Sequence, residues 1–298
     1  MRPGTGLGIT DKKFGDYARD ASNWITLASG EFYPDILPQA CELYSPVLVL
    51  FGQLLKQSES STALFMDISG VRAGGMRVQL SRIFRKYVCP ALSVEMFRRK
   101  RQAKTICDRF AGEFRKVVEV QAAFASRPIP DEALCALLWE HKNRGKKGYD
   151  LTERFFAMVR QQLPGYTITG PERSGQEIRI GSIWPDYTKP DRPADFVLRK
   201  ADALLAIGFA RYDGDRGGAQ EDDRTGGYRD CAAEILAYTS AHKLRRVKIV
   251  FLNDGPGLLL GSMWRDYALL EELGKGRIRV LTLRMVPDRL TRKWLESP

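Results

Sequence analysis

Apolar residues in the first half of the chain recur at spacings of three and four, which is the periodicity of amphipathic helices. The pattern predicts four helices, over residues 36–56, 76–87, 94–124 and 131–142. In the third of these, apolar side chains between Val94 and Val118 would line one side and arginines the other, until Pro128 and Pro130 end the helix. The first half of the chain is therefore expected to be mainly helical.

After residue 148 the pattern changes to short β-rich runs that alternate with helical periods. A helix is expected to begin near Asp150 or Thr152 and to end at Gln162. Strands are predicted over 166–169, 177–180, 195–198, 203–212, 247–252 and 278–285, with helices over 228–242 and 264–273. Strands that alternate with helices indicate a mixed α/β sheet. The sequence thus predicts a mainly helical part, residues 1–145, followed by an α/β domain, residues 146–298.

The net charge of +11 is concentrated in one segment of the helical part. Residues 71–127 contain 14 Lys and Arg against 4 Asp and Glu, so 14 − 4 = +10. Such a basic segment is typical of a protein with a polyanionic partner. We expect this segment to embrace double-stranded DNA or to form a dimer contact, with Arg98, Arg99 and Arg101 bound to the DNA. Lys146 and Lys147 belong to the later run KNRGKK, which is either a hinge or a loop that touches phosphates. For any single arginine, the alternative is a solvated helix face.

Several classes of protein do not fit the composition. No apolar run reaches the ~18 residues that a membrane-spanning helix needs, and the N-terminal residues lack the apolar core of a signal peptide. We therefore expect a cytoplasmic protein without membrane contact. The five cysteines are scattered and form no CxxC pair, so neither a disulfide framework nor a structural zinc site is expected.

The candidate chemistry lies in residues 189–213, KPDRPADFVLRKADALLAIGFARYD. Cleavage of a phosphodiester needs a divalent cation to polarise the phosphate and to lower the pKa of an attacking water. Hard cations take oxygen ligands, so carboxylates must converge at strand ends with a positive charge nearby. Asp195 opens one predicted strand, a turn near residues 200–202 reverses the chain, and a second strand ends in Arg211. The hairpin would therefore bring an acid and a cation together.

With these residues, the range 148–285 resembles the PD-(D/E)XK nuclease superfamily, and especially the type II restriction endonucleases. The resemblance rests on the order of helix, hairpin, helix, strand, helix and strand, with an acid at the head of the hairpin. It implies a restriction-endonuclease-like mixed sheet flanked by helices, Mg²⁺-dependent cleavage of duplex DNA by a homodimer, and a cognate DNA methyltransferase in the same system. The family's first acid corresponds to Asp195, with Asp191 as a competitor, and its lysine position corresponds to Arg211.

Two positions depart from the family pattern. The second acid should stand two residues before the lysine on the same strand face, but that residue is Phe209, which cannot bind a metal. Arginine in place of lysine can stabilise an anion but cannot readily exchange a proton at neutral pH. Some members carry the missing acid on the next helix, where Glu234 lies amid apolar residues and would need a partner. That partner is either a metal or an ion pair with Arg229 or Lys243.

Two further carboxylates are candidates for the metal site. Glu153 lies on the helix that opens the domain, and its alternative role is an exposed charge interacting with the helix dipole. Glu221 lies in the unusual run 211–228, RYDGDRGGAQEDDRTGGY. In the same run, Arg216, Gln220 and Arg224 could read guanine and adenine edges. The alternative for this run is a solvated, self-paired loop.

These observations predict a sequence-specific endonuclease that cuts double-stranded DNA. Asp195 and a displaced glutamate, Glu234 or Glu221, would bind Mg²⁺, and Arg211 would stabilise the charge on the phosphorane. Two other functions remain open. One is a non-catalytic nucleic-acid-binding protein on a nuclease fold, and the other is a repair or mobile-element nuclease without sequence specificity.

Overall fold

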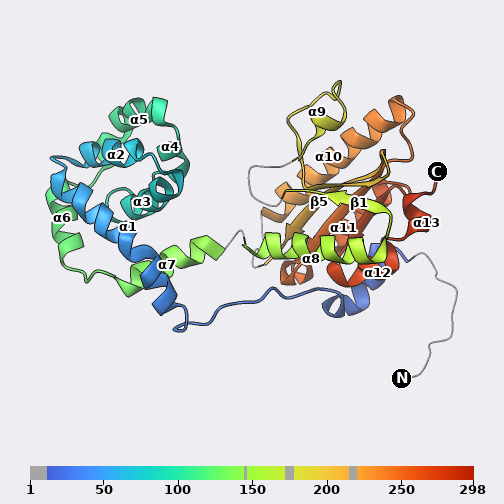
Figure 1. Cartoon of the computed structure of the whole chain (residues 1–298), viewed down its shortest axis with the longest axis horizontal. Coiled ribbons are helices and arrows are strands. Elements are labelled where there is room, and N and C mark those ends of the chain that lie inside the picture. The colour runs from blue at the N-terminus through green and yellow to red at the C-terminus, as the bar shows by residue number, and fades with distance from the viewer. Residues whose placement is uncertain (1–11, 144–145, 172–177, 215–219) are drawn as a thin grey trace. The chain divides into compact units, whose positions relative to one another are not determined.

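The computed structural model describes residues 12–143, 146–171, 178–214 and 220–298, with the side chains of 141–149 and 220–224 outside the description (Figure 1). The chain divides into two compact units. One is Gly30–Arg144, and the other joins Met1–Ser29 to Gly145–Pro298. The mixed α/β class that the sequence predicts is confirmed.

The unit Gly30–Arg144 is built from helices in its described part. They are α1 Leu37–Gln57, α2 Ser61–Gly70, α3 Gly74–Tyr87, α4 Val94–Arg98, α5 Ala103–Phe110, α6 Val117–Ala125 and α7 Glu132–Asn143, with short 3₁₀ turns between α4, α5 and α6. Their core contains a cluster of aromatic rings, in which Phe65 lies 4.4 Å from Phe97 and 5.8 Å from Phe84. No helix among the described residues is long and apolar enough to cross a membrane.

The single helix predicted over residues 94–124 is wrong, because the structure divides this range into α4, α5 and α6. The backbone leaves the helical region at Arg99, where ψ is 65°, and at Phe114, where ψ is 130°. Phe114 contacts Phe65 and Phe84 at 6.0 and 5.4 Å between ring centroids. The apolar stripe is therefore buried by three short helices folded around the aromatic cluster.

The other unit contains a five-stranded sheet in the order β1-β4-β5-β6-β7. Figure 1 labels β1 and β5 of this sheet. The strands β1 Tyr166–Thr169, β4 Phe196–Lys200 and β5 Ala203–Tyr212 pair antiparallel, and β6 Lys248–Asp254 and β7 Ile278–Leu281 continue parallel to β5. The parallel connections need crossovers, which are made by α10 Gln220–Ala241 and α11 Met263–Leu273. Helix α8, Lys146–Gln162, precedes β1, while α12 Val286–Arg289 and α13 Arg292–Leu295 end the chain.

A small excursion lies between β1 and β4. It contains the two-stranded sheet of β2 Ile178–Arg179 and β3 Pro193–Ala194, with the short helix α9 Ile180–Ile183. The sequence predicted a strand over 177–180, and the structure confirms a strand of two residues there. A 3₁₀ segment follows β7 over Leu283–Met285, where the sequence predicted that the strand would continue.

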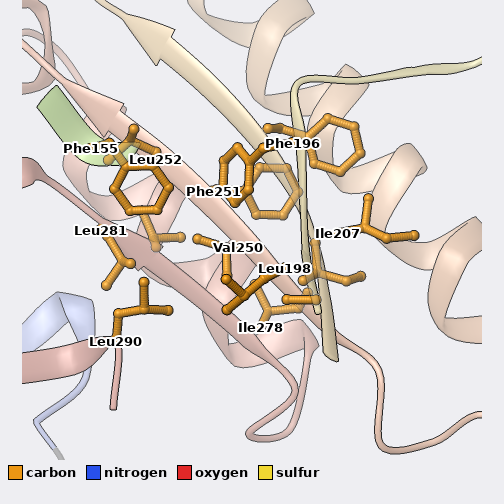
Figure 2. Close-up of a cluster of buried hydrophobic side chains, with 14 of the residues drawn as sticks. Phe155, Phe196, Leu198, Ile207, Val250, Phe251, Leu252, Ile278, Leu281 and Leu290 are labelled. Carbon is orange, nitrogen blue, oxygen red and sulfur yellow. The ribbon is translucent and has the colours of Figure 1, made fainter. Parts of the chain in front are cut away.

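Both faces of the large sheet are covered by hydrophobic side chains. On one face the ring of Phe155 from α8 lies 5.0 Å from that of Phe196, and Figure 2 shows these rings together with aliphatic side chains of β6 and β7. The Phe196 ring occupies the space beside Gly208, where an added Cβ would lie 1.9 Å from a ring carbon. On the opposite face Phe209, Phe251 and Tyr228 of α10 stack together. Glycine at 208 thus permits the close approach of ring and strand.

The segment before Gly30 packs on the sheet unit. Its 3₁₀ helix Phe14–Asn23 buries Phe14, whose ring stacks on Trp264 at 4.4 Å. The backbone N–H of Phe14 donates to Glu271 Oε1 at 2.9 Å, and Trp264 Nε1 donates to the carbonyl of Phe14 at 3.2 Å. The division predicted from the sequence, which places residues 1–145 in one mainly helical part, differs from the structure here. The segment's buried Phe14 instead packs on α11, far along the chain, while the ring of Tyr17 packs on Trp24 of the same segment.

The carboxylate of Asp254 joins three parts of the sheet unit. This fully buried side chain accepts hydrogen bonds from the backbone N–H groups of Thr26 at 2.6 Å, Gly255 at 2.7 Å and Leu283 at 2.9 Å. Burial raises the pKa of Asp254, and the backbone donors oppose that rise. The end of β6, the segment before Gly30 and the turn after β7 are therefore held at one point.

We expect Phe14→Ala to lower the free energy of unfolding of the sheet unit by about 3–5 kcal/mol, because it empties a fully buried aromatic site. Urea titration followed by tryptophan fluorescence measures this change. Leu27→Ala is the matched control, since Leu27 is 68% exposed in the same segment. Equal effects of the two substitutions would show that Phe14 does not anchor the segment.

Candidate functional site

The candidate site lies where β5 and β6 end, on the sheet face covered by α10 and α11. Alternate residues of a strand face opposite sides, so Phe209, Arg211 and Asp213 share one face. Arg211 is in register with Asn253 on the parallel neighbour β6. Polar residues thus follow directly after the buried apolar part of both strands. In α/β sheets the carboxyl ends of parallel strands are the usual place for ligands.

Asp195 lies immediately before β4 and is bound to the neighbouring strand through its backbone and its side chain. Its N–H donates to the carbonyl of Gly208 at 2.9 Å, and its Oδ2 accepts the N–H of Ala210 at 2.8 Å. The half-buried carboxylate is therefore fixed alongside β5 at the residue before Arg211. The structure therefore brings Asp195 and Arg211 to the same part of the hairpin, as the sequence predicts.

Arg211 is held by a carboxylate that the sequence analysis did not select. Its Nε lies 2.9 Å from Asp213 Oδ1, and the two side chains are 31% and 1% exposed. The backbone of Asp213 is fixed as well, because its N–H donates to Asp254 and its carbonyl accepts from Gly257. Gly255 has φ +111°, and a Cβ there would lie 2.3 Å from the Asp213 carbonyl oxygen. Asp213 is thus a rigid, buried partner for Arg211.

Two tyrosines cover this ion pair from the helices. The hydroxyl of Tyr267, on α11, donates to Asp213 Oδ2 at 3.3 Å. The ring of Tyr228, on α10, lies 4.8 Å from Phe251 and 6.4 Å from Tyr267. Burial raises the pKa of both phenols, and the charge of Asp213 raises each further, together with that of Asp195 at Tyr228. Both hydroxyls are therefore neutral donors at physiological pH.

Phe209 occupies the strand position where the resemblance calls for an acid. The side chain is buried and its ring stacks on Phe251 at 5.3 Å. The position is a hydrophobic contact between β5 and β6, so it supplies no ligand for a cation.

Glu234 is engaged in ion pairs away from the end of β5. Its carboxylate contacts Lys189 and lies 2.8 Å from Arg192 Nη2. From the sequence, the expected partner of Glu234 is either a metal or an ion pair with Arg229 or Lys243. The structure provides an ion pair, but its cations come from the excursion between β1 and β4. Glu234 therefore fastens that excursion to α10.

Glu153 and Asp191 also lie apart from the hairpin site. Glu153 is exposed and lines a hollow of about 450 Å³ together with Tyr212, whose side chain faces the opposite side of β5 from Arg211. Asp191 pairs with Arg179 at 2.6 Å on the surface. Asp195 is consequently the one of the two competing acids that lies next to β5.

The remaining expected residues fall into two groups. Arg216 lies outside the described residues, as do the side chains of Gln220, Glu221, Arg224, Lys146 and Lys147. Arg98, Arg99 and Arg101 are exposed in the helical unit and line a hollow of about 480 Å³ with Lys100 and Gln102. Arg98 also pairs with Glu95 at 3.1 Å.

A divalent cation fits this site only if most of its ligands come from water and phosphate. Among the described residues, no group of three or more His, Cys, Asp or Glu side chains could hold a metal ion. Mg²⁺ is commonly bound by one or two carboxylates, with waters and substrate phosphates as the other ligands. Asp195 is suited to that role because it supplies a hard oxygen ligand next to Arg211.

Sequence reasoning missed Asn253, Tyr228 and Tyr267 as parts of the site. A signal for Asn253 was present, because it follows the apolar run of a predicted strand, where α/β sheets carry functional residues. The two tyrosines gave no such signal. They reach the site through the packing of α10 and α11, which the periodicity of each helix does not specify.

We expect Glu234→Gln to lower the free energy of unfolding by about 1 kcal/mol, because two partly exposed ion pairs are lost while the volume is kept. Urea titration measures this loss. Asp230→Asn, an exposed change on the same helix, is the control. If the stability of the variant without Mg²⁺ is unchanged but its urea midpoint no longer rises when Mg²⁺ is added, Glu234 instead binds the metal.

Comparison with known protein families, with curated proteins and with solved structures gave no match to this chain.

Proposed function

We propose that the protein is a metal-dependent DNA endonuclease of the PD-(D/E)XK kind, acting as a type II restriction enzyme. The observation that carries the proposal is the hydrogen bond from the N–H of Ala210 to Asp195 Oδ2. It fixes an acid beside Arg211 at the end of a β-hairpin. An acid and a cation in that arrangement are what phosphodiester hydrolysis needs.

The order of elements gives further support. Helix α8, the hairpin of β4 and β5, the crossover α10, strand β6, helix α11 and strand β7 follow in this order in the sheet unit, with β1 and the small excursion between α8 and the hairpin. This is the order on which the resemblance of the sequence rests, so we propose a restriction-endonuclease-like sheet.

In the proposed reaction each residue at the end of β5 has a separate task. Magnesium, when bound, would polarise the scissile phosphate and lower the pKa of an attacking water. The Asp195 carboxylate would hold the metal, and its contact with Ala210 fixes the direction of that carboxylate. Arg211 would bind a non-bridging phosphate oxygen and stabilise the charge that develops there. Tyr228 and Tyr267 would remain neutral hydrogen-bond donors.

Phe209 stands where such a site carries its second carboxylate, and it cannot supply one. Glu234 is a poor candidate for that ligand. Using Glu234 would require breaking its ion pairs with Lys189 and Arg192. Glu221 stays a candidate on the grounds of its place in the sequence alone. The proposal therefore rests on Asp195 and Arg211.

The basic helical unit would supply affinity for the DNA backbone. Exposed Arg99 and Arg101 can pair with phosphates, which positions a protein without specifying sequence. Cleavage of both strands of a short palindrome would follow if a homodimer presented two equivalent sites. In a restriction system the partner would be a DNA methyltransferase that protects the same sequence.

A second candidate function is DNA binding without cleavage. Phe209 favours it, because a buried aromatic stack replaces the acid that most nucleases of this kind need. The two functions differ in what happens to DNA when magnesium is present.

We expect the purified protein to cut plasmid DNA into discrete fragments with Mg²⁺, and Asp195→Asn to slow cutting by about 100-fold or more because the metal loses its carboxylate. Gel electrophoresis of a time course measures the rate. Asp191→Asn is the control, since this exposed acid pairs with Arg179 instead. A smear would indicate a nuclease without sequence specificity, and DNA that is retarded but uncut would favour the binding protein.

We expect the double variant Arg99→Gln, Arg101→Gln to weaken binding of every DNA sequence. The slope of log affinity against log salt should become shallower by about 0.9 for each phosphate that the variant no longer neutralises. Fluorescence anisotropy over a salt series measures both effects. Arg115→Gln is a suitable control, because this arginine pairs with Glu119 at 3.4 Å. An unchanged slope would exclude these two arginines from the DNA interface.

A further inference from the structure

A basic hollow of about 510 Å³ lies beside the start of β7 in the sheet unit. Because β7 runs parallel to β5 and β6, its start lies at the opposite edge of the sheet from the strand ends that carry Arg211. Two glutamates line the hollow, so its lining has an excess of three positive charges. The five cations of the lining are Lys12, Lys13, Lys275, Arg279 and Arg289. A hollow of this size falls within the range of small-molecule sites, about 300–1,000 Å³.

Direct contacts join the walls of this basic hollow. Arg289 Nε donates to the carbonyl of Lys12 at 3.1 Å, and Arg279 donates to the carbonyl of Arg289. The guanidinium of Arg279 lies 4.7 Å from the centre of the Trp294 ring. Trp294 Nε1 donates in turn to the carbonyl of Gly276, in the turn between α11 and β7, at 2.8 Å. The segment before Gly30, that turn and the two last helices are therefore fixed around one space.

The two glutamates of the lining do not neutralise its lysines. Both oxygens of Glu271 lie 2.7 Å from Arg289 Nη2 and also accept backbone N–H groups, while Glu272 is exposed. Within the part of the chain that the structure describes, the three lysines form no ion pair. A cleft lined by charges of one sign concentrates counter-ions. The hollow is therefore suited to an anion.

The backbone of Lys275 adopts a conformation that favours glycine. Its φ is +45°, in the left-handed region, where a side chain with a Cβ is strained. Glycine adopts the same turn without that strain. Stability alone therefore favours glycine at this position, whereas an anion in the hollow favours lysine.

The hollow differs from the one that Arg98, Arg99 and Arg101 line. That hollow is formed by five consecutive residues, and its arginines are exposed. Here Arg279 and Arg289 are only 5% and 3% exposed, and the walls come from both ends of the chain. Exposed arginines in a row suit the extended backbone of DNA, whereas fixed charges around an enclosed space suit a compact ligand. Among compact anions, phosphate groups are strongly bound by arginine and lysine.

We propose that the basic hollow at the start of β7 binds a compact polyphosphate group, either free or at the end of a nucleotide. The exposed ammonium groups of Lys12, Lys13 and Lys275 contact its oxygens, and the two arginines keep the wall behind it positive. The excess of three charges matches a diphosphate or triphosphate. The inference is independent of the proposed function, because it involves neither DNA nor the residues at the end of β5.

The probe is tripolyphosphate, titrated into the full-length protein without divalent cations and followed by calorimetry. We expect saturable binding whose affinity falls as the salt concentration rises. The ligand should also raise the urea midpoint of unfolding, because it binds the folded state and links the segment before Gly30 to the rest of the unit. ATP in the same buffer separates the two sources. Tighter binding of ATP than of tripolyphosphate indicates a nucleotide, and equal or weaker binding indicates a free polyphosphate.

The decisive variant is Lys275→Gly, with Lys243→Gly as its matched control. Lys243 is also an exposed lysine in the left-handed region, with φ +59°, but it follows α10 and does not line the hollow. Each substitution removes one charge and relieves the same backbone strain, so the two should change the urea midpoint without ligand alike. We expect only Lys275→Gly to weaken tripolyphosphate binding, by about tenfold, the size typical of a lost hydrogen bond to a charged group. The double variant Lys12→Gln, Lys13→Gln should weaken it at least as much.

Three results would overturn the inference. The first is a wild-type protein that shows no saturable binding of tripolyphosphate. The second is an equal loss of affinity in Lys275→Gly and Lys243→Gly, which would reduce the binding to a general effect of net charge. The third is a Lys275→Gly variant that binds a DNA duplex more weakly but tripolyphosphate as tightly as the wild type, which would assign the hollow to the DNA backbone.

Discussion

The sheet unit depends on how a buried carboxylate is satisfied. Asp254 gathers backbone N–H groups from three segments, and its own carbonyl accepts the N–H of Asp213. Because β5 ends at Asp213's neighbour and β6 at Asp254, this one residue sets the positions of both strand ends. The ion pair of Arg211 with Asp213 is placed by the same contacts. Water could not replace these partners, since the Asp254 side chain is closed to solvent.

The buried carboxylate of Glu271 is compensated by an ion pair and by backbone hydrogen bonds. Both of its carboxylate oxygens lie 2.7 Å from Arg289 Nη2, and they also accept from Phe14 and Val280. A buried ion pair that keeps all its hydrogen bonds is tolerated, whereas one that loses a partner is costly. The compensation is incomplete elsewhere among the described residues, because the amide of Asn253, the hydroxyl of Tyr187 and Nε of Arg277 are buried without a hydrogen-bond partner. Such exceptions are expected where function competes with stability.

The sequence predicted local elements well wherever one period dominated. The strands at 166–169 and 203–212 agree with the structure, because alternation and flanking turns marked their ends. The prediction of a single helix over residues 94–124 failed, because the stripe of apolar residues continues through three helices. The points at which the chain leaves the helical conformation depend on aromatic packing. At the site, the proximity of Asp195 and Arg211 could be predicted, because both residues lie on one hairpin that the sequence indicates. The ion pair with Asp213 and the position of Asn253 beside Arg211 could not, because they depend on how β5 and β6 pair through the α10 crossover.

The docking of Phe14 on α11 makes the sheet unit discontinuous along the chain, with the helical unit inserted after Ser29. During synthesis on a ribosome, all of Gly30–Arg144 emerges before the residues that bind Phe14 have been made. The helical unit can therefore fold first, while the N-terminal segment must wait for Trp264 and Glu271. Closure of the sheet unit thus becomes a late event in biogenesis, and the end of β6 is braced only after nearly the whole chain has been translated.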